Sequence, residues 1–308
     1  MLPRIRVPSR LSNLASLAVV VALAGCGRDA TLLAPGDAAS PGLVPDPQGV
    51  SAAASGLESQ SRSSSLSPQV SASAIEIHGP TVIIEPGAYR VVQDFSVSAE
   101  TGDGIVIRSD DVQLSLEGYA IAGPGNKAGR GIVVDGAKNV DITGGTLRTF
   151  GVGLALLGTS QSTVRGVTVE GGDEMAAPPA NPPQIGLLLV NSWQNAVTEN
   201  RLSLVNLGIF VRGGGSFENR ILNNTVTAGS NGLLGICYNP ASGEGPVGPT
   251  RDKVTHNVLD GFGGGIQTST GSTENRFVAN VIRFLNVAWD DRNGTNVFLG
   301  NKTEDLTP

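Results

Sequence analysis

The stretch LGIFVRGGGSFENRILNNTVT, residues 207–227, decides which fold this sequence favours. It interleaves aliphatic residues, three consecutive glycines and three asparagines within twenty-one residues. Ile and Val favour strands, whereas Asn and Gly favour turns. One occurrence of this pattern would indicate a hairpin. Recurrence along the chain would instead indicate a repeat architecture.

A glycine followed by alternating aliphatic residues recurs from residue 104 onward. The first core positions of these GIxI segments are Ile105, Ile132, Leu154, Leu187, Ile209, Ile236 and Ile266, with Val287 in a last copy that lacks the glycine. Their spacings are 27, 22, 33, 22, 27, 30 and 21 residues. A base period near 22 with insertions, and an apolar alternation of period two, predicts strands stacked coil on coil and not a helical solenoid.

Each repeat also contains two apolar residues five positions apart. These pairs are Leu116/Ile121, Ile142/Leu147, Val164/Val169, Val197/Leu202, Ile221/Val226, Val254/Leu259 and Phe277/Ile282. The constant spacing indicates a strand, a bend and a strand of fixed geometry.

Asparagines occur at two fixed phases of these repeats. One set follows the first strand and consists of Asn200, Asn224, Asn257, Asn280 and Asn301. Asn suits this bend because it tolerates the left-handed conformation and because its amide can bond the Asn of the next coil, about 4.8 Å away. A second set marks the start of the first strand and consists of Asn195, Asn219, Asn275 and Asn296. Both sets are expected to be structural.

The repeats resemble right-handed parallel β-helix proteins of the pectate-lyase-like class, and most closely the short tandem repeats of the NosD type. The stretch IIEPGAYRVVQDFSVS, residues 83–98, resembles the segment that precedes such repeats. The resemblance covers about residues 80–303. It implies an all-β, single-stranded right-handed parallel β-helix of about eight to nine coils. It implies no single activity, because the fold carries lyases, hydrolases, epimerases and non-catalytic proteins.

The N-terminus is predicted to be a targeting segment. Basic residues in MLPRIRVPSR precede the apolar run LASLAVVVALAG, which is typical of a secretory signal; a transmembrane anchor is the alternative. Residues 23–26, Leu-Ala-Gly-Cys, resemble the lipobox of bacterial lipoproteins. This resemblance implies cleavage before Cys26 and its lipidation, and hence a bacterial protein anchored to the outer membrane or cell surface. Lipidation of Cys26 would leave Cys237 without an intrachain disulfide partner.

Three regions follow from these patterns. Residues 1–25 form the lipoprotein signal peptide. Residues 26–74 are dominated by Ser, Ala, Pro and Gly, and they are expected to form a disordered tether. Residues 75–308 form the β-helix domain.

Charge and composition limit the partners and cofactors. The net charge is −6, and no Lys/Arg cluster adjoins exposed aromatic residues, so a nucleic-acid partner is not expected. Two His and two Cys without a Cys-x-x-Cys motif make a zinc or copper site improbable. No cofactor is therefore predicted, and an oxygen-ligand calcium site is left open.

The resemblance implies that the GIxI strands line a substrate groove. Two insertions flank this face, GGDEMAAPPANPPQ (171–184) and NPASGEGPVGPT (239–250), and long loops on a rigid scaffold often carry function. Leu157, Leu188, Val190 and Phe210 point outward and form an apolar patch. Either the 171–184 segment folds over the patch, or Phe210 supports a sugar ring while Arg212 and Asn239 bind polar groups.

Candidate catalytic residues are few. A polysaccharide lyase needs a base and a cation, and Arg212 with Lys253 or His256 could supply them. A glycoside hydrolase needs two carboxylates across the bond, and Asp290 with Asp291 is the only adjacent acidic pair near this face. The sequence therefore favours polysaccharide binding, with lyase chemistry ahead of hydrolysis if the protein is an enzyme. A non-catalytic adhesion or scaffold module of the envelope is the alternative.

The last repeat shows no amphipathic cap after Val297-Phe298-Leu299. Uncapped solenoid ends invite pairing. An end-on protein contact is expected at the C-terminal coil.

Overall fold

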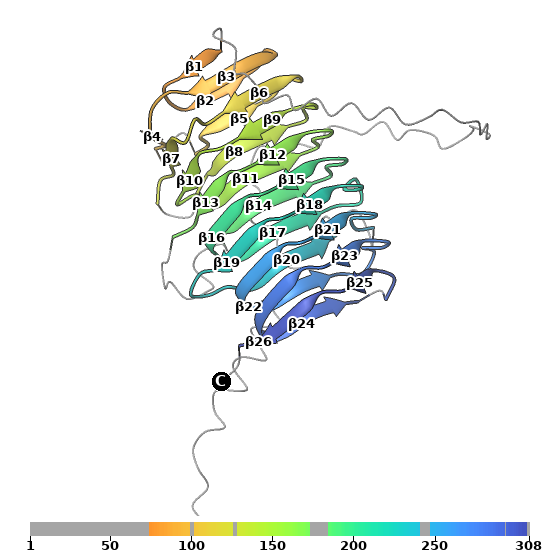
Figure 1. Cartoon of the computed structure of the whole chain (residues 1–308). Helices are drawn as coiled ribbons and strands as arrows, with labels where there is room; N and C mark the ends of the chain where they lie inside the picture. Colours follow the sequence, from red (N-terminus) through yellow and green to blue (C-terminus); the bar gives the residue numbers. More distant parts are fainter. Residues whose placement is uncertain are drawn as a thin grey trace, which may run out of the picture.

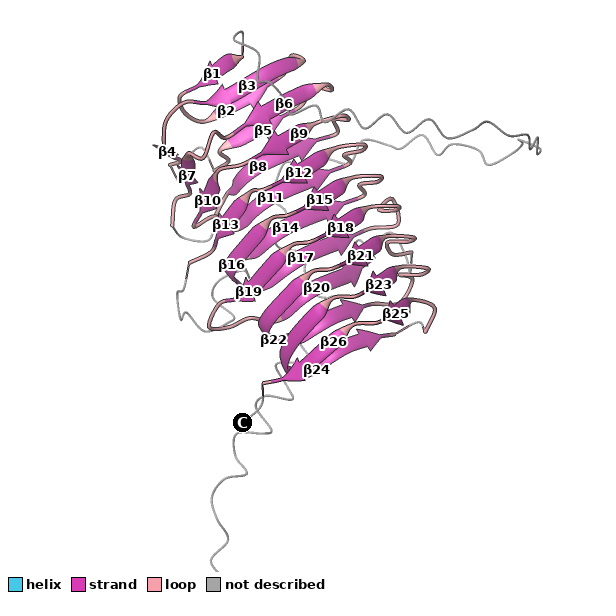
Figure 2. Cartoon of the chain, viewed as in Figure 1, coloured by secondary structure: helices cyan, strands magenta, loops and turns pink. Residues whose placement is uncertain are grey.

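The computed structural model describes residues 74–98, 102–125, 128–172, 184–240, 247–292 and 294–306. Within these ranges the chain consists of strands, turns and bends, and no helix long and apolar enough to cross a membrane occurs there. Every strand pairing in these ranges is parallel, and the coils stack along one axis (Figures 1 and 2). The prediction of an all-β parallel β-helix is confirmed. The expected signal peptide and all of the expected tether except Ala74 lie outside the described residues.

One face of the solenoid is a ten-stranded sheet, called sheet A below. Its strands, in spatial order, are β1 (Ile75–Ile77), β3 (Gly87–Val91), β6 (Val112–Ser115), β9 (Asp141–Thr143), β12 (Thr163–Arg165), β15 (Ala196–Thr198), β18 (Arg220–Leu222), β21 (Lys253–Thr255), β23 (Arg276–Val278) and β25 (Val297–Leu299).

The second face, called the GIxI face, contains the glycine-led strands. They are β2 (Thr81–Ile83), β5 (Ile105–Ile107), β8 (Arg130–Asp135), β11 (Val152–Leu157), β14 (Ile185–Val190), β17 (Leu207–Arg212), β20 (Leu234–Asn239) and the second halves of β22 (Val258–Thr268) and β24 (Val281–Asp291).

The third face completes each coil. It contains β4 (Phe95–Ser96), β7 (Ala120–Ala122), β10 (Thr146–Arg148), β13 (Thr168–Glu170), β16 (Arg201–Val205), β19 (Thr225–Ala228), the first halves of β22 and β24, and β26 (Lys302–Asp305).

Inward side chains from the three faces form one continuous apolar core. Alternation along each strand directs every second residue inward, so Ile209 and Val211 are buried in the core. The leading glycines have a separate role: a Cβ on Gly208 would overlap the Gly235 carbonyl of the next coil and the Val226 side chain. Glycine therefore permits close approach between the GIxI face and the third face.

The predicted first core positions from Ile105 to Ile266 are aligned in register on neighbouring strands. The last one was wrong: Trp289, and not Val287, is aligned with Ile266. The offset between β22 and β24 is 23 residues both before and after a local irregularity at Phe262, and Val287 is aligned with Gly264. In the first repeat, Leu114 and not Leu116 is aligned with Ile142.

Two columns of buried polar side chains bracket sheet A. The bend column follows its strands and consists of Asn200, Asn224, Asn257, Asn280 and Asn301. The start column precedes its strands and consists of Asn195, Asn219, Asp252, Asn275 and Asn296.

The reason expected for Asn in the bend was partly wrong. The left-handed conformation belongs to the residue before each Asn, as at Glu199 (φ 57°) and His256 (φ 58°). The column asparagines are instead held by their side-chain hydrogen bonds from coil to coil.

Candidate functional site

The outward residues of the GIxI face form a second apolar cluster, separate from the core. Leu188, Phe210 and Cys237 are aligned in register on β14, β17 and β20. Although they point away from the core, Phe210 is only 5% exposed and Leu188 only 9%. The predicted apolar patch is therefore largely buried at its centre, while Leu157 and Val190 at its margin are half-buried. The segment 173–183, which was expected to cover it, lies outside the described residues.

Polar side chains continue this face toward the C-terminal coils. The guanidinium of Arg212 lies 6.0 Å from the centroid of the Phe210 ring. Arg212 is aligned with Asn239 on the next coil. The Ser269 hydroxyl donates to Asn239 Oδ1 at 2.9 Å. Arg212 and Asn239 are buried, at 7% and 5% exposure, whereas Ser269 is half-buried. The structure therefore brings together the three binding residues expected from the sequence, Phe210, Arg212 and Asn239.

Asp290 lies on the same face, at its C-terminal end. It is aligned with Gln267, whose amide donates to Asp290 Oδ2 at 3.2 Å. Arg292 Nε donates to the same oxygen at 3.0 Å. Asp291 instead accepts from the buried Thr268 hydroxyl at 2.9 Å. The two acids therefore have different partners, and they do not face each other across a groove as a hydrolase would require.

The other two candidate catalytic residues lie elsewhere. Lys253 belongs to β21 of sheet A, between β18 and β23. His256 follows β21 directly and is exposed. Arg212 lies on β17 of the GIxI face. The structure does not bring Lys253 or His256 to Arg212, so the cation–base pair considered for a lyase is not assembled.

A buried acid that the sequence interpretation missed lies in the start column. Asp252 has the phase of Asn219 and Asn275 but was overlooked because only asparagines were aligned. Burial raises its pKa to about 7, while hydrogen bonds from Asn219 and the nearby hydroxyl of Tyr238 oppose the rise. Burial and the neighbouring Asp252 raise the pKa of Tyr238 well above its usual range. The Tyr238 hydroxyl lies close to the acid, but no hydrogen bond of good geometry joins them.

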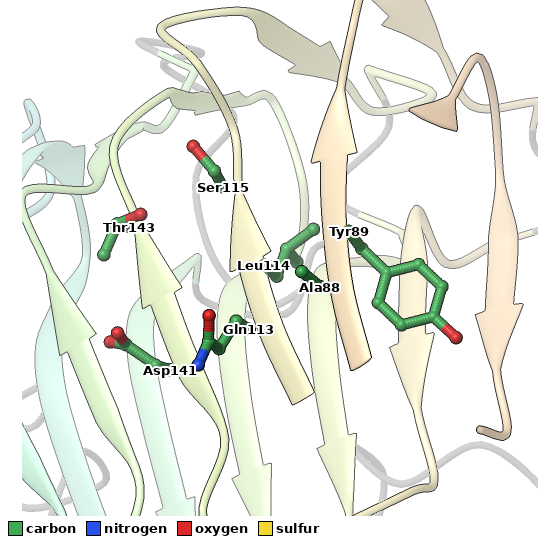
Figure 3. Close-up of a pocket in the computed structure, with 7 residues that line it drawn as sticks. All are labelled: Ala88, Tyr89, Gln113, Leu114, Ser115, Asp141 and Thr143. Atoms are coloured by element: carbon green, nitrogen blue, oxygen red, sulfur yellow. The ribbon is translucent and has the colours of Figure 1, made fainter. Parts of the chain in front are cut away.

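A shallow depression lies on the outer surface of sheet A near its N-terminal coils (Figure 3). Gln113 and Asp141 lie side by side there, and Ser115 and Thr143 follow on the same two strands. Burial raises the pKa of Asp141, and the nearby Arg165 opposes this rise. The remaining residues around the depression are Ala88, Tyr89 and Leu114. This surface was not singled out from the sequence.

The cysteines differ from expectation. Cys237 is disulfide-bonded in the structure, so the prediction that it has no partner cysteine is wrong there. Cys26, the chain's other cysteine, lies outside the described residues. Within the described residues, no group of three or more His, Cys, Asp or Glu side chains could hold a metal ion.

Several solved structures are similar to this chain. The Dettilon tailspike protein is 19% identical, with 75% of this chain and 55% of that chain covered and a TM-score of 0.52. The endo-xylogalacturonan hydrolase from Aspergillus tubingensis is 12% identical, with 73% and 85% covered and a TM-score of 0.47. A mutant of the periplasmic alginate epimerase AlgG is 11% identical, with 74% of each chain covered and a TM-score of 0.39.

No curated protein matches the chain. The family model described as "Right handed beta helix region" matches residues 81–282, which is most of the described domain. The three-strand coils, the parallel pairing and this match agree with the fold that the resemblance implied. The chain belongs to the right-handed β-helix family.

Proposed function

We propose that this protein is a lipid-anchored protein of a bacterial envelope that binds polysaccharide at the polar C-terminal part of its GIxI face. The observation that carries the proposal is the set of in-register polar residues beside Phe210, in which Arg212, Asn239 and Ser269 occupy one outward row. Hydroxyl, amide and guanidinium groups next to an aromatic ring are what sugar hydroxyls and the apolar faces of sugar rings require. The likeness to polysaccharide-processing structures supports the fold, and the site residues support the ligand class.

The ligand would first meet the half-buried members of this region. Gln267, Ser269 and Asp290 are half-buried, whereas Phe210, Arg212 and Asn239 are almost fully buried. Contact with Phe210 therefore requires that whatever covers it move aside. Sugar hydroxyls would then exchange with the hydrogen bonds that join Asn239 to Ser269 and Gln267 to Asp290.

Binding is favoured over cleavage because the described GIxI strands present no base near Arg212 and no opposed pair of carboxylates. A non-catalytic adhesion or scaffold module is the second candidate. The buried apolar cluster of this face favours it, because an enzyme groove would need that cluster open to its substrate.

Binding is tested with the unmodified mature chain and the double variant Gln267→Ala/Ser269→Ala against a panel of neutral and uronate polysaccharides. We expect the double variant to bind its best glycan roughly tenfold more weakly, which corresponds to the loss of one or two hydrogen bonds. Thr225→Ala, on the third face, is the control and should leave the affinity unchanged. Equal binding by the double variant and the unmodified chain would refute this site. Release of reducing ends or of unsaturated uronates would establish cleavage.

The proposed anchor is a lipid on Cys26. A thioether-linked lipid and a disulfide to Cys237 exclude each other, because both use the same sulfur. Mass spectrometry of the protein from bacterial membranes should therefore find acylated Cys26, and Cys26→Ser should release the protein from the membrane. A non-reduced protein with the two cysteines linked would contradict the anchor.

An end-on protein contact stays a prediction. Leu285, Val287 and Trp289 on β24 are exposed, and each is about 40% accessible at the C-terminal coil. Sedimentation of the mature chain should show association that increases with concentration and is weakened by Trp289→Ser. A concentration-independent monomer would contradict it.

A further inference from the structure

Sheet A carries a row of three cations on its outer surface. Arg220 on β18, Lys253 on β21 and Arg276 on β23 are aligned in register on neighbouring strands. All three side chains are exposed. Because adjacent strands lie about 4.8 Å apart, the row spans about 10 Å along the solenoid axis.

This row departs from the charge pattern of the rest of the described molecule. Elsewhere, charged residues matched on neighbouring coils have opposite signs and form ion pairs. These pairs are Glu76/Arg90, Asp103/Arg130, Arg108/Asp135, Asp110/Lys138, Arg148/Glu170, Glu218/Arg251, Asp260/Arg283 and Arg283/Glu304. Arg220, Lys253 and Arg276 form no ion pair with any described residue.

The acids near the row do not neutralise it. Glu218 is engaged by Arg251 Nε at 3.2 Å. Asp252 is buried in the start column. Glu274 is exposed two residues before Arg276, but among the described side chains it has no ion-pair partner. Like charges aligned across strands repel one another, and an anion that bridges them removes this repulsion.

We propose that Arg220, Lys253 and Arg276 form a binding surface for an acidic polysaccharide, a linear polymer whose carboxylates recur along its length. A second outward row lies beside the cations and consists of Leu222, Thr255 and Val278, again in register. Leu222 and Val278 are half-buried, and their aliphatic side chains suit the C–H faces of sugar rings. The surface goes beyond the proposed function, because it lies on another sheet and shares no residue with the GIxI site.

A nucleic acid fits this surface less well. Single strands bind proteins largely by stacking bases on aromatic rings. No aromatic side chain points outward from the described strands β15, β18, β21 and β23. The rings of Trp193 and Phe217 precede β15 and β18 and stack on each other with centroids 6.0 Å apart, and the Arg251 guanidinium lies 5.7 Å from the Phe217 centroid. The Phe217 ring is therefore already in contact with two neighbours.

The test measures retention of the full mature chain on immobilised polygalacturonate, with dextran as the neutral counterpart, over increasing NaCl. The variant Arg220→Gln/Lys253→Gln/Arg276→Gln removes the row. The matched control Arg148→Gln/Arg201→Gln/Lys302→Gln removes the same charge from the third face. We expect the unmodified chain to bind polygalacturonate but not dextran, the row variant to bind at least roughly tenfold more weakly, and the control to stay within about twofold.

Three outcomes would overturn the proposal: no retention of the unmodified chain at low salt, equal weakening by the control, or stronger binding to a single-stranded DNA of matched charge. Thermal unfolding of each variant identifies a folding defect, and Arg220→Lys/Arg276→Lys, which keeps the charges, should retain binding. The two proposals fail separately, because the Gln267→Ala/Ser269→Ala variant leaves the cation row intact and the row variant leaves the GIxI site intact.

Discussion

The bend column and the start column run through the same coils at opposite ends of the sheet A strands, yet they differ at one residue. The bend column contains only Asn, whereas the start column contains Asp252 between Asn219 and Asn275. The difference between the columns is therefore the replacement of one amide NH2 by a carboxyl oxygen in otherwise equivalent buried surroundings.

Asn257 shows what an amide does in such a column. Its Oδ1 accepts from the backbone N and from Nδ2 of Asn224, both at 2.9 Å. Its Nδ2 donates to Asn280 Oδ1 at 3.0 Å and to the Ile221 carbonyl at 2.9 Å. The side chain thus accepts from the preceding coil and donates to both the preceding and the following coil, which an amide can do and a carboxylate cannot.

Asp252 fulfils only the accepting part. Its Oδ1 accepts from the backbone N of Asn219 at 2.7 Å and from Asn219 Nδ2 at 3.2 Å, but its Oδ2 has no hydrogen-bond partner. The equivalent atom of the neighbouring rung, Asn219 Nδ2, donates to the Ser192 carbonyl, so Oδ2 of Asp252 takes the place of a donor. A protonated carboxyl can donate there, and an ionised one cannot. Asp252 can therefore both accept and donate, as the asparagines of the column do, only when its carboxyl group is neutral.

The consequence for stability follows from the raised pKa. Asp252 titrates near 3.9 in an unfolded chain and at about 7 in the folded protein. Its contribution to stability is therefore complete below pH 4 and is lost as the pH rises through about 7. A shift of this size corresponds to about 4 kcal/mol.

The largest effect on stability is expected in the bend column, which contains only Asn. Asn257→Ala should lower the free energy of unfolding by about 3–5 kcal/mol, because it removes hydrogen bonds to buried groups on the preceding and the following coil. Urea unfolding followed by circular dichroism measures the loss. Asn231→Ala, at an exposed position, is the control and should change stability by less than about 0.5 kcal/mol. A loss below about 1 kcal/mol for Asn257→Ala would mean that the column is not a main source of stability.

The second-largest effect is expected for a substitution that gives the start column an Asn at every position. Asp252→Asn should raise the free energy of unfolding by up to about 4 kcal/mol at pH 8, because the amide supplies the missing donor without ionising. At pH 4 the variant and the unmodified protein should have nearly equal stability. Urea unfolding from pH 4 to pH 9 tests this. A stability difference independent of pH would contradict the assignment of the titration to Asp252.

The smallest effect on stability is expected for a substitution of Tyr238, whose hydroxyl lies close to Asp252. Its hydroxyl opposes the rise in the pKa of Asp252, so Tyr238→Phe should raise that pKa further. The pH at which stability is lost should move upward, with about 1 kcal/mol less stability at pH 8. The same pH series of unfolding curves measures the shift. An unchanged or lower midpoint would show that the hydroxyl does not act on Asp252.

Much of the fold could be predicted because its signals are local. The alternation in GIFV at Gly208 and the phase of Asn224 within its repeat depend on only a few residues of chain. The two register errors, at Val287 and Leu116, arose where the alignment depends on pairing with the neighbouring coil and not on the local sequence. Trp289 and not Val287 is aligned with Ile266, and the last copy lacks the leading glycine that marks the first core position in the other repeats.

The candidate site was predicted less completely. Phe210, Arg212 and Asn239 were identified because they alternate with core residues along single strands. Whether the patch around Phe210 is covered was left open, and the burial of Arg212 and Asn239 was not predicted, because burial depends on what lies over a strand. Asp252 was missed because its role depends on the asparagines above and below it and not on its own sequence neighbours.

By itself, the sequence determined the β-helix, the faces of its strands and the asparagine columns, since alternation along a strand directs successive side chains to opposite sides. Only the tertiary structure decided which outward residues meet. Arg220, Lys253 and Arg276 are separated by 33 and 23 residues in the chain, yet they lie in one row. Insertions of variable length are absorbed in the turns, and backbone pairing between coils then sets the register that brings such residues together.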